Sequence, residues 1–370
     1  MLNMGKIRVA VFCGGQSAEH DVSLASGKNI ADALDPSRYD ITLVAVDRTG
    51  VLRLIPHIDE LRKTTLDKPI DVTRFSTKVA LYRGDLGPVL VETGTGKKLT
   101  ELDVAFPILH GPYGEDGTVQ GFFKFIGLPF VGPSVLGSSA GMDKDVTKRL
   151  LRDAGIGIGK FEVLHRHKEK AQPTSFATLK SKLGTPFFLK PVNMGSSIGV
   201  HKVTSEETYS KAIANAFLFD TKVIVEEFID GREIECAVIG LHNLQASPPA
   251  EIIPKHEFYS YEAKYLDDNG AAIELPAKVT ADQAKEFAQI AVRVCETLEC
   301  RGLSRVDFFL RKSDGAILVN EINTLPGFTK ISMYPKMMEQ TGRTYAGLID
   351  ELIRLAIERR EEEASLRVNA

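Results

Sequence analysis

The sequence lacks the features that would indicate a membrane or secreted protein. Its four cysteines, at positions 13, 236, 295 and 300, form no CxxC pair, and a chain of 370 residues is large for a disulfide scaffold. They are typical of reduced thiols in a cytoplasmic protein. No apolar run reaches membrane-spanning length, because the nearest, around residues 122–135, contains two glycines and two prolines. The chain starts MLNMGKIRVAVF, without the pattern of a signal peptide.

A strong net charge, internal repeats and low-complexity segments are also absent. The 46 basic and 49 acidic residues give a formal net charge of −3. This balance gives no indication of a nucleic-acid or membrane partner, so a bound anion would need a local cluster of Lys, Arg and backbone N–H groups. The length predicts two or three domains.

The N-terminal residues predict a parallel α/β sheet. Residues 7–13 form an apolar run that ends at Gly14-Gly15 and leads into a helical segment, and residues 39–46 repeat the strand pattern. The full GxGxxG spacing is missing, so no dinucleotide site is predicted. Glu19 follows the carboxyl end of the first strand, where such sheets bind ligands. A helix-capping carboxylate explains Glu19 equally well.

A glycine-rich loop follows the next predicted strand, in DVAFPILHGPYGEDGTVQG. Its glycines give the backbone unusual freedom, and a loop that combines glycines with His110 and Glu115 is more often functional than not. Helix capping would account for Asp116 and Thr118 but not for His110. Residues 50–100 contain short β-like pieces without helical periodicity, and no function is predicted there.

Three lysines and a small-residue turn come next. Residues 138–154 predict one helix ended by Gly155, with Lys144 and Lys148 one turn apart, and a solvated helix face explains both. GTPFFLKPVNMGSSIGVHKV predicts two strands joined by a turn that offers N–H groups and hydroxyls to a phosphate. Lys190 lies in the first of these strands, where it either extends to solvent or meets a partner such as a phosphate.

The later segments complete the predicted elements. KVIVEEFIDGREIECAVIG predicts two strands with an acidic linker, and residues 254–270 predict a mobile loop that could close over a site. Residues 280–299 predict a helix with a capping box between Thr280 and Gln283. A final helix is predicted after Thr344, with a solvated charged end.

The segment RVDFFLRKSDGAILVNEINTLPG predicts a hairpin with a polar face. Arg305 and Asp307 are two residues apart in one apolar run, as are Glu321 and Asn323 in the next, so each pair points to one side of its strand. Two carboxylates and an amide on one face repel each other unless a cation lies between them, and Mg²⁺ prefers such oxygen ligands. The alternative is the solvated outer face of an ordinary hairpin.

The pairing across this hairpin depends on its turn at residues 313–315. A three-residue loop with Gly315 in the left-handed conformation pairs Lys312 with Ala316. Counting back then places Asp307 opposite Glu321, and residue 305 opposite residue 323. A two-residue loop would spoil this register unless a bulge restored it.

The blocks FCGGQSAEHDVS, HGPYGEDGTVQG, LKPVNMGSSIGV, VEEFIDGREIEC, EAKY, SRVDFF and NEINTLPG occur in this order over almost the whole chain. Together they resemble the D-alanine–D-alanine ligase family of the ATP-grasp superfamily. The resemblance implies an α/β plus α+β architecture of three domains that holds ATP between two antiparallel sheets. These are a Rossmann-like domain (1–132), a central ATP-grasp subdomain (133–226) and a C-terminal ATP-grasp subdomain with the metal site and closing loop (227–370).

The resemblance also implies a reaction. ATP and two D-alanines give D-alanyl-D-alanine, ADP and phosphate through an acyl phosphate, for peptidoglycan precursors. It implies two Mg²⁺ ions, with Mn²⁺ as an alternative metal, and a homodimer whose partners are ATP and D-alanine. The cytoplasmic location is the one that the cysteines indicate.

The resemblance assigns roles to individual residues. The metal ligands are Asp307, Glu321 and Asn323. The ATP contacts are Lys144, Lys190 and Lys264 on phosphates, Ser197 in the small-residue turn, Glu226 on the adenine amino group, Phe228 and Ile229 at the hinge, and Glu233 on the ribose. The catalytic and substrate residues are Glu19, His110, Ser196, Tyr265, Arg305, Gly327, Ser332 and Met333.

Within that last set the implied roles differ. Glu19 binds the ammonium of the first D-alanine, near His110, and joins Ser196 and Tyr265 in a trio that fixes the closed loop. Arg305 and the N–H of Gly327 stabilise the oxyanion, while Ser332 and Met333 bind the second carboxylate. Two positions depart from the family pattern, since Asn193-Met194 replaces a segment that often carries a charge and Leu325 replaces a small residue.

Several rival functions stay open at this point. A D-alanine–D-lactate or D-alanine–D-serine ligase shares the pattern, although Tyr265 is the form found in dipeptide ligases. A biotin-dependent carboxylase subunit shares the ATP-grasp half but would not explain HGPYGEDG or Glu19. A non-catalytic nucleotide-binding regulator would not need Arg305 together with the metal ligands.

Overall fold

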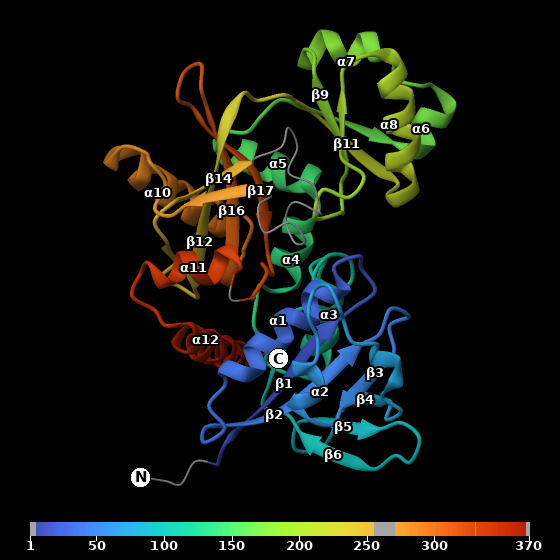
Figure 1. Ribbon diagram of the computed structural model, residues 1–370, viewed down its shortest axis with the longest axis vertical. Coiled ribbons are helices and arrows are strands. Elements are labelled where there is room, and N and C mark those ends of the chain that lie inside the picture. The colour runs from blue at the N-terminus through green and yellow to red at the C-terminus, as the bar shows by residue number, and fades with distance from the viewer. Residues whose placement is uncertain (1–4, 255–270, 330, 368–370) are drawn as a thin grey trace.

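The structure is a computed structural model that describes residues 5–254, 271–329 and 331–367. Its strands form four sheets, arranged as a lower part that contains the N-terminal residues, a left part and a separate upper lobe (Figure 1). The α/β plus α+β class expected from the sequence is confirmed, because one sheet has parallel strands and the other three are antiparallel. No helix within the described ranges is long and apolar enough to cross a membrane.

The N-terminal sheet has the strand order β3-β2-β1-β7. Its elements and the neighbouring helices are β1 (Ile7–Gly14), α1 (His20–Ala33), β2 (Tyr39–Val46), β3 (Leu52–Ile55), α2 (Ile58–Arg62), β7 (Val104–Pro107) and α3 (Thr118–Ile126). β1 pairs in parallel with both β2 and β7, and its residues from Val9 to Cys13 are at most 1% exposed. A strand covered on both faces reads as a continuous apolar run, which is how the sequence predicted it.

Residues between β3 and β7 form a small antiparallel sheet. It contains β4 (Val79–Arg83), β5 (Pro88–Glu92) and β6 (Lys98–Glu101), preceded by a 3₁₀ turn at Val72–Arg74. The short β-like pieces expected here are confirmed, whereas helix α2 was not predicted. This sheet lies at the edge of the N-terminal part, away from the upper lobe (Figure 1).

The upper lobe is built on an antiparallel sheet of order β10-β9-β11-β8. Its elements are β8 (Phe161–His165), α6 (Arg166–Ala171), α7 (Phe176–Leu183), β9 (Phe187–Pro191), β10 (His201–Val203), α8 (Glu206–Phe219) and β11 (Lys222–Glu227). Its core is a cluster of its own, which includes Phe187, Leu189 and Val225.

The largest sheet has the order β15-β14-β12-β16-β17, with β13 paired to β12. Its elements and helices are β12 (Gly231–Gly240), β13 (Gln245–Ala246), β14 (Ala250–Pro254), β15 (Ala271–Glu274), α10 (Ala281–Thr297), β16 (Gly302–Arg311), β17 (Ile317–Asn323), α11 (Met333–Glu339) and α12 (Tyr345–Ser365). The capping box of Thr280 with Gln283 is present at α10. Helix α12 returns to the N-terminal sheet, and its Leu348 and Leu352 share one core with Val9 and Val11 (Figure 1).

The single helix predicted over residues 138–154 is wrong. The structure has two helices, α4 (Val135–Met142) and α5 (Lys144–Asp153), separated by Asp143. Asp143 adopts an extended backbone with ψ of 100°, and its carboxylate accepts a hydrogen bond from the N–H of Val146 at 2.9 Å. A side chain that caps the second helix in this way ends the hydrogen-bond ladder of the first.

The predicted register of the β16–β17 hairpin is correct at the polar face and wrong at the turn. Asp307 faces Glu321 and residue 305 faces residue 323, as expected. Near the turn, however, the N–H of Arg311 donates to the carbonyl of Ala316, and Lys312 N–H donates instead to Asp230. A β-bulge between Asp307 and Phe308 offsets this one-residue difference, so the site keeps its register.

Candidate active site

The predicted metal and oxyanion residues lie on one face of the β16–β17 hairpin. The Arg305 guanidinium donates to both carboxylate oxygens of Asp307, at 2.7 Å each. The side-chain nitrogen of Asn323 donates to the same carboxylate at 2.9 Å, and Glu321 faces Asp307 across the strand pair. The hairpin therefore brings all four side chains together, as the two-residue spacing predicted.

These residues suit a hard divalent cation in their chemistry. Two carboxylates and an amide oxygen are ligands that Mg²⁺ prefers, and rotation of the Asn323 amide would present its oxygen instead of its nitrogen. Within the described part of the chain, no group of three His, Cys, Asp or Glu side chains is arranged to hold a metal ion. Only Asp307 and Glu321 of the predicted trio belong to those types, so the amide would have to complete the set.

A third carboxylate on this face was missed in the sequence. Glu235 on β12 lies opposite Asp307, and its Oε2 is 3.3 Å from the Nε of Arg305. Its signal was its position two residues after Glu233 on the same predicted strand. Arg305 thus lies between two carboxylates from neighbouring strands, which fixes the direction of its guanidinium.

A cavity with a volume of ≈ 240 Å³ lies between the upper lobe and the largest sheet. The predicted ATP residues that line it are Lys144, Lys190, Ser197, Glu226, Phe228, Ile229 and Glu233, together with Ser196 and Glu321. Residues from three sequence blocks therefore meet around one space. Lys264 and Tyr265, which were also predicted to act here, lie outside the described residues.

Three buried charges form the base of this cavity. The two oxygens of Glu226 contact the Nζ atoms of Lys148 and Lys190 at 2.6 and 2.7 Å. Burial alone would raise the pKa of Glu226, but the two lysines outweigh it and hold this pKa at about 2. Burial would lower the pKa of Lys190, yet the charges of Glu226 and Glu321 outweigh it and the pKa is raised.

Lys148 was expected on a solvated helix face, and that interpretation is wrong. The residue is 2% exposed and faces inward from α5, one turn after Lys144. An amphipathic helix pattern predicts that its lysines are exposed to solvent unless a buried partner is known. That partner, Glu226, is 78 positions further along the sequence and could not be identified from the local pattern. The pairing therefore depends on how the upper lobe packs against α5.

Lys144 extends from the first turn of α5 toward the small-residue turn and the hairpin. Its Nζ donates to the carbonyl of Met194 at 2.7 Å and lies 3.5 Å from Oε2 of Glu321. The lysine thus sits between the predicted phosphate turn and a predicted metal ligand. A triphosphate that bound between them would therefore meet the Lys144 ammonium.

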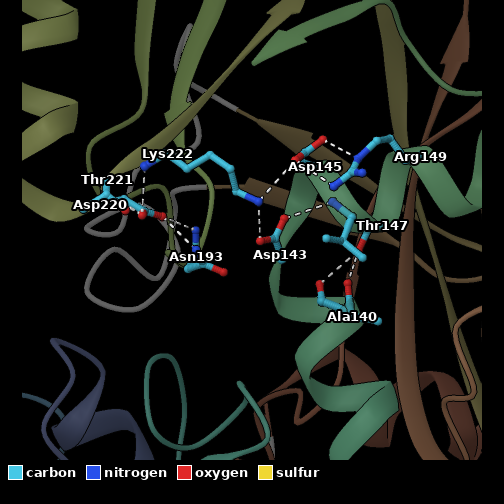
Figure 2. A network of polar contacts seen from close by, with 11 residues as sticks. Ala140, Asp143, Asp145, Thr147, Arg149, Asn193, Asp220, Thr221 and Lys222 are labelled. Atoms are coloured by element: carbon cyan, nitrogen blue, oxygen red, sulfur yellow. Dashed lines mark hydrogen bonds and ion pairs between the residues drawn. The ribbon is translucent and has the colours of Figure 1, made fainter. Parts of the chain in front are cut away.

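A polar network holds α5 against the upper lobe (Figure 2). The Nζ of Lys222 on β11 contacts Asp143 at 2.5 Å and Asp145 at 3.2 Å, at the start of α5 (Figure 2). Asp220, two residues before Lys222, accepts hydrogen bonds from the backbone and side-chain nitrogens of Asn193 at 2.8 and 3.0 Å. The network fixes the helix that carries Lys144 relative to the strands that carry the other cavity residues.

The predicted first-substrate corner is formed by loops of the N-terminal sheet and the small-residue turn. Ser196 donates a hydrogen bond to a carboxylate oxygen of Glu19, 177 positions earlier in the chain. The side chain of Glu19 makes no capping hydrogen bond to helix α1, so the capping alternative is not supported. His110 is 4% exposed, and its buried Nε2 has no hydrogen-bond partner among the described residues.

The burial of His110 has a consequence for its charge. Burial lowers the pKa of the imidazole, while the nearby charge of Glu19 opposes this effect only in part. The Nδ1 atom lies 2.9 Å from the carbonyl of Leu325, which can only accept, so Nδ1 carries a proton and donates. The neutral ring then has an acceptor at the buried Nε2.

Residues 324–333 lead from β17 to α11 and contain the remaining predicted residues. Ser332 occupies the position just before α11, and its hydroxyl accepts a hydrogen bond from the N–H of Thr329 at 3.0 Å. Gly327 lies beside it, since a Cβ at Gly327 would be 3.0 Å from the Ser332 hydroxyl. Met333 begins α11. Gly327 and Ser332 therefore lie next to each other, and Met333 follows Ser332 directly.

Comparisons with known proteins agree over nearly the whole chain. Family models described as "D-ala D-ala ligase N-terminus" and "D-ala D-ala ligase C-terminus" match residues 8–133 and 150–354. A D-alanine–D-alanine ligase of Oceanobacillus iheyensis is 47% identical over 362 residues, which cover 98% of each chain.

Solved structures agree as well. The D-alanine-D-alanine ligase from Coxiella burnetii superposes with a TM-score of 0.85 at 35% identity, covering 97% of this chain and 96% of the other. The VanG D-Ala:D-Ser ligase from Enterococcus faecalis gives a TM-score of 0.82 at 34% identity, covering 95% of this chain and 100% of the other. The expected ATP-grasp fold with its Rossmann-like N-terminal domain is thereby confirmed. With matching family models at both ends and a relative of this identity, the chain belongs to the D-alanine–D-alanine ligase family.

Proposed function

We propose that the chain is an ATP-dependent ligase that joins two D-alanines into D-alanyl-D-alanine for peptidoglycan precursors. The support is family membership at 47% identity over 98% of the chain. The observation that carries the site assignment is the hydrogen bond between Ser196 and Glu19. It connects the predicted phosphate turn with the predicted ammonium-binding carboxylate, so nucleotide and amino acid would meet at this point.

The first step activates a poor electrophile. The carboxylate of the first D-alanine attacks the γ-phosphorus of ATP, the bond to the bridging oxygen of ADP breaks, and an acyl phosphate forms. Such transfer depends on positioning and charge neutralisation. We assign this task to Lys144, Lys190 and Lys264. The support is that Lys144 and Lys190 line the cavity, whereas Lys264 lies outside the described residues. Ser197 lines the cavity too and would donate to a phosphate.

A divalent metal completes the charge neutralisation. Asp307, Glu321 and Asn323 would hold it, because they supply the oxygen ligands that Mg²⁺ prefers and share one face of the hairpin. When bound, the metal neutralises phosphate charge and orients the transferred group. Two Mg²⁺ ions, with Mn²⁺ as an alternative metal, are our proposal from the family resemblance.

The second step forms the peptide bond. The unprotonated amine of the second D-alanine attacks the acyl carbonyl, and a tetrahedral oxyanion forms. Its collapse releases phosphate with the original carboxylate oxygen, and the new amide nitrogen gives up one proton. Arg305 and the N–H of Gly327 are the proposed donors to that oxyanion, and one such donor is typically worth about 3 kcal/mol in the transition state. Ser332 and Met333 would take the carboxylate of the attacking D-alanine.

The remaining assignments concern the first amino acid and the nucleoside. Glu19 would bind the ammonium of the first D-alanine, with buried His110 beside it. At the other end, Glu226 would accept from the adenine amino group. The hinge residues Phe228 and Ile229 would contact the base, and Glu233 the ribose. Their support is that all four line the same cavity as the lysines.

Three further assignments stay proposals. We place domain boundaries at 132/133 and 226/227, because residues 133–226 contain the lobe sheet except for Glu227, the last residue of β11. We propose a homodimer, supported by Phe125, which is 90% exposed on α3, and by the exposed Leu136 on the adjoining α4. A cytoplasmic location is supported by four buried free thiols, which are typical of a reducing compartment.

Phosphate release tests this proposal. With ATP and Mg²⁺, we expect phosphate release that depends on D-alanine and a dipeptide product in equal amount. No D-alanine dependence would refute the ligase assignment. Assays with D-alanine plus D-serine or D-lactate across pH address the alternative substrates, of which D-serine has structural support from the VanG superposition. A mixed product in preference to the dipeptide would replace the proposed second substrate.

A further inference from the structure

Gly327 lies within residues 324–329, a described stretch that belongs to no strand or helix. In the proposed function, on which this inference rests, the N–H of Gly327 faces the oxyanion. The direction of that N–H depends on how the preceding peptides are fixed. Both backbone groups of Leu325, two residues earlier, bind side chains of the glycine-rich loop at residues 110–115.

Glu115 makes the first of these bonds. Its Oε2 accepts from the N–H of Leu325 at 3.1 Å and lies 3.4 Å from the hydroxyl of Thr324. Its Oε1 accepts from the N–H of Gly111 at 2.8 Å, while its own N–H donates to the carbonyl of Gly111 at 2.9 Å. One carboxylate therefore links two segments that are 210 positions apart in the sequence.

The loop that carries Glu115 has little freedom to move. A Cβ at Gly114 would lie 2.0 Å from the carbonyl oxygen of Leu109, so only glycine fits there. Gly111 has a φ of +73°, and a Cβ on it would lie 3.2 Å from a carboxylate oxygen of Glu19. The position of Glu115 is thus set by close backbone packing next to the predicted first-substrate corner.

His110 binds the other backbone group of Leu325, its carbonyl. Its Nδ1–H donates to the carbonyl of Leu325 at 2.9 Å, so donor and acceptor of Leu325 are both fixed from the N-terminal part. Further along, the N–H of Phe328 bonds to Ser26 at 3.3 Å. The backbone around Gly327 is therefore held on both sides by the N-terminal part, through the loop at residues 110–115 and Ser26 of helix α1.

We propose that Glu115 is a positioning residue of the condensation step, which orients the N–H of Gly327 through the Leu325 peptide. It does not contact the cavity that we assign to ATP, whose lining residues do not include it. Its loss should leave phosphoryl transfer largely intact and slow the attack of the amine. Water would then compete for the acyl phosphate, and ATP consumption would exceed dipeptide formation.

Glu115→Gln tests this proposal, because glutamine keeps the size but offers only one acceptor oxygen to two backbone donors. We expect the kcat of dipeptide formation to fall about 10- to 100-fold. The KM for ATP should stay within about twofold, and the ratio of ATP consumed to dipeptide formed should rise above one. Asp116→Asn is the matched control, since the Asp116 carboxylate accepts hydrogen bonds from the nearby backbone N–H groups of Tyr113 and Thr118, and this variant should keep the ratio at one.

Glu115→Asp keeps the charge and provides a second variant in case Glu115→Gln fails to fold. We expect it to raise the ratio of ATP consumed to dipeptide formed by a smaller amount. A ratio of one in both variants would overturn the proposal and leave Glu115 with a structural role, even if the melting temperature falls. Phosphate release by the wild type distinguishes failure of this proposal from failure of the proposed function. Absence of any D-alanine-dependent phosphate release in the wild type would refute the ligase itself.

Discussion

At the scale of single residues, the base of the cavity shows how charge is kept inside the protein. Glu226 is 7% exposed, and each of its oxygens is bound by one lysine. A buried ion pair contributes little net stability compared with apolar side chains, but removal of one partner leaves a buried charge without compensation. Lys148 and Lys190 therefore keep Glu226 ionised and oriented toward the space that we assign to adenine.

Replacement of Lys148 should be costly for this reason. For Lys148→Met we expect the free energy of unfolding to fall by about 3 kcal/mol, measured by urea denaturation without nucleotide. Lys211→Met is the control, because Lys211 pairs with Glu207 on an exposed face of α8 and should change stability by less than about 1 kcal/mol. Equal effects of the two substitutions would contradict the buried role of Lys148.

Glu115 gives a pH-dependent prediction. Burial, and after it the charge of Glu19, raise the pKa of Glu115 from 4.5 to about 7. Buried His110 on the same loop faces this pair with a pKa that burial lowers, so it adds little positive charge. The folded state then holds a proton that the unfolded state releases, and stability present below pH 4.5 is lost as the pH rises through 7.

The difference between wild type and Glu115→Gln isolates this effect. Between pH of about 5 and about 8, the wild type should lose up to about 3 kcal/mol of unfolding free energy relative to the variant. Denaturation curves at several pH values, without ATP, measure it. Parallel pH profiles for the two proteins would show that Glu115 titrates in the same range folded and unfolded.

At the scale of elements, the β16–β17 hairpin presents its polar face through alternation. Val306 and Ile322 are buried in the core behind the sheet, while Asp307 and Glu321 face the other way. Glu321→Gln keeps the size and removes one negative charge. We expect turnover to fall at least about 100-fold with an unchanged melting temperature, because the metal would lose a charged ligand. Near-normal activity would show that the metal assignment is wrong.

Helix α5 is positioned by contacts with strand β11 of the upper lobe. Lys222 binds Asp143 and Asp145 at its start, with 17% of the lysine side chain exposed (Figure 2). In Lys222→Met we expect the KM for ATP to rise about fivefold, because Lys144 is on the same helix. This rise corresponds to a loss of about 1 kcal/mol in the free energy of ATP binding. Steady-state kinetics measure it, with Lys211→Met as the control. A changed kcat with an unchanged KM would argue against this role.

Elements with a strong local signal could be predicted from the sequence. β1, β2 and the capped helix α10 lie where the apolar pattern placed them. The break at Asp143 was missed because apolar periodicity continues through it and the capping bond is visible only in three dimensions. The turn register was off by one because a bulge cannot be read from alternation alone. The site residues on the hairpin were unaffected, since the bulge restores their pairing.

At the scale of the whole molecule, the site depends on contacts between distant segments. Glu19 with Ser196, Glu115 with Leu325, and Lys148 with Glu226 each join different parts of the fold. Local sequence patterns do not predict which distant segments contact each other. The family resemblance supplied the first pairing in advance, while nothing indicated the other two. Helix α12 contributes to the same assembly by packing its apolar side on the N-terminal sheet (Figure 1).

The central claim is that the assembled site passes D-alanine through an acyl phosphate. D-alanine labelled with ¹⁸O in both carboxylate oxygens tests it most directly, with ATP, Mg²⁺ and mass spectrometry of the released phosphate. The account predicts one ¹⁸O atom in each phosphate and the loss of one from the first residue of the dipeptide, because the carboxylate oxygen that attacks the γ-phosphorus leaves with it. Dipeptide formation with unlabelled phosphate would contradict the account.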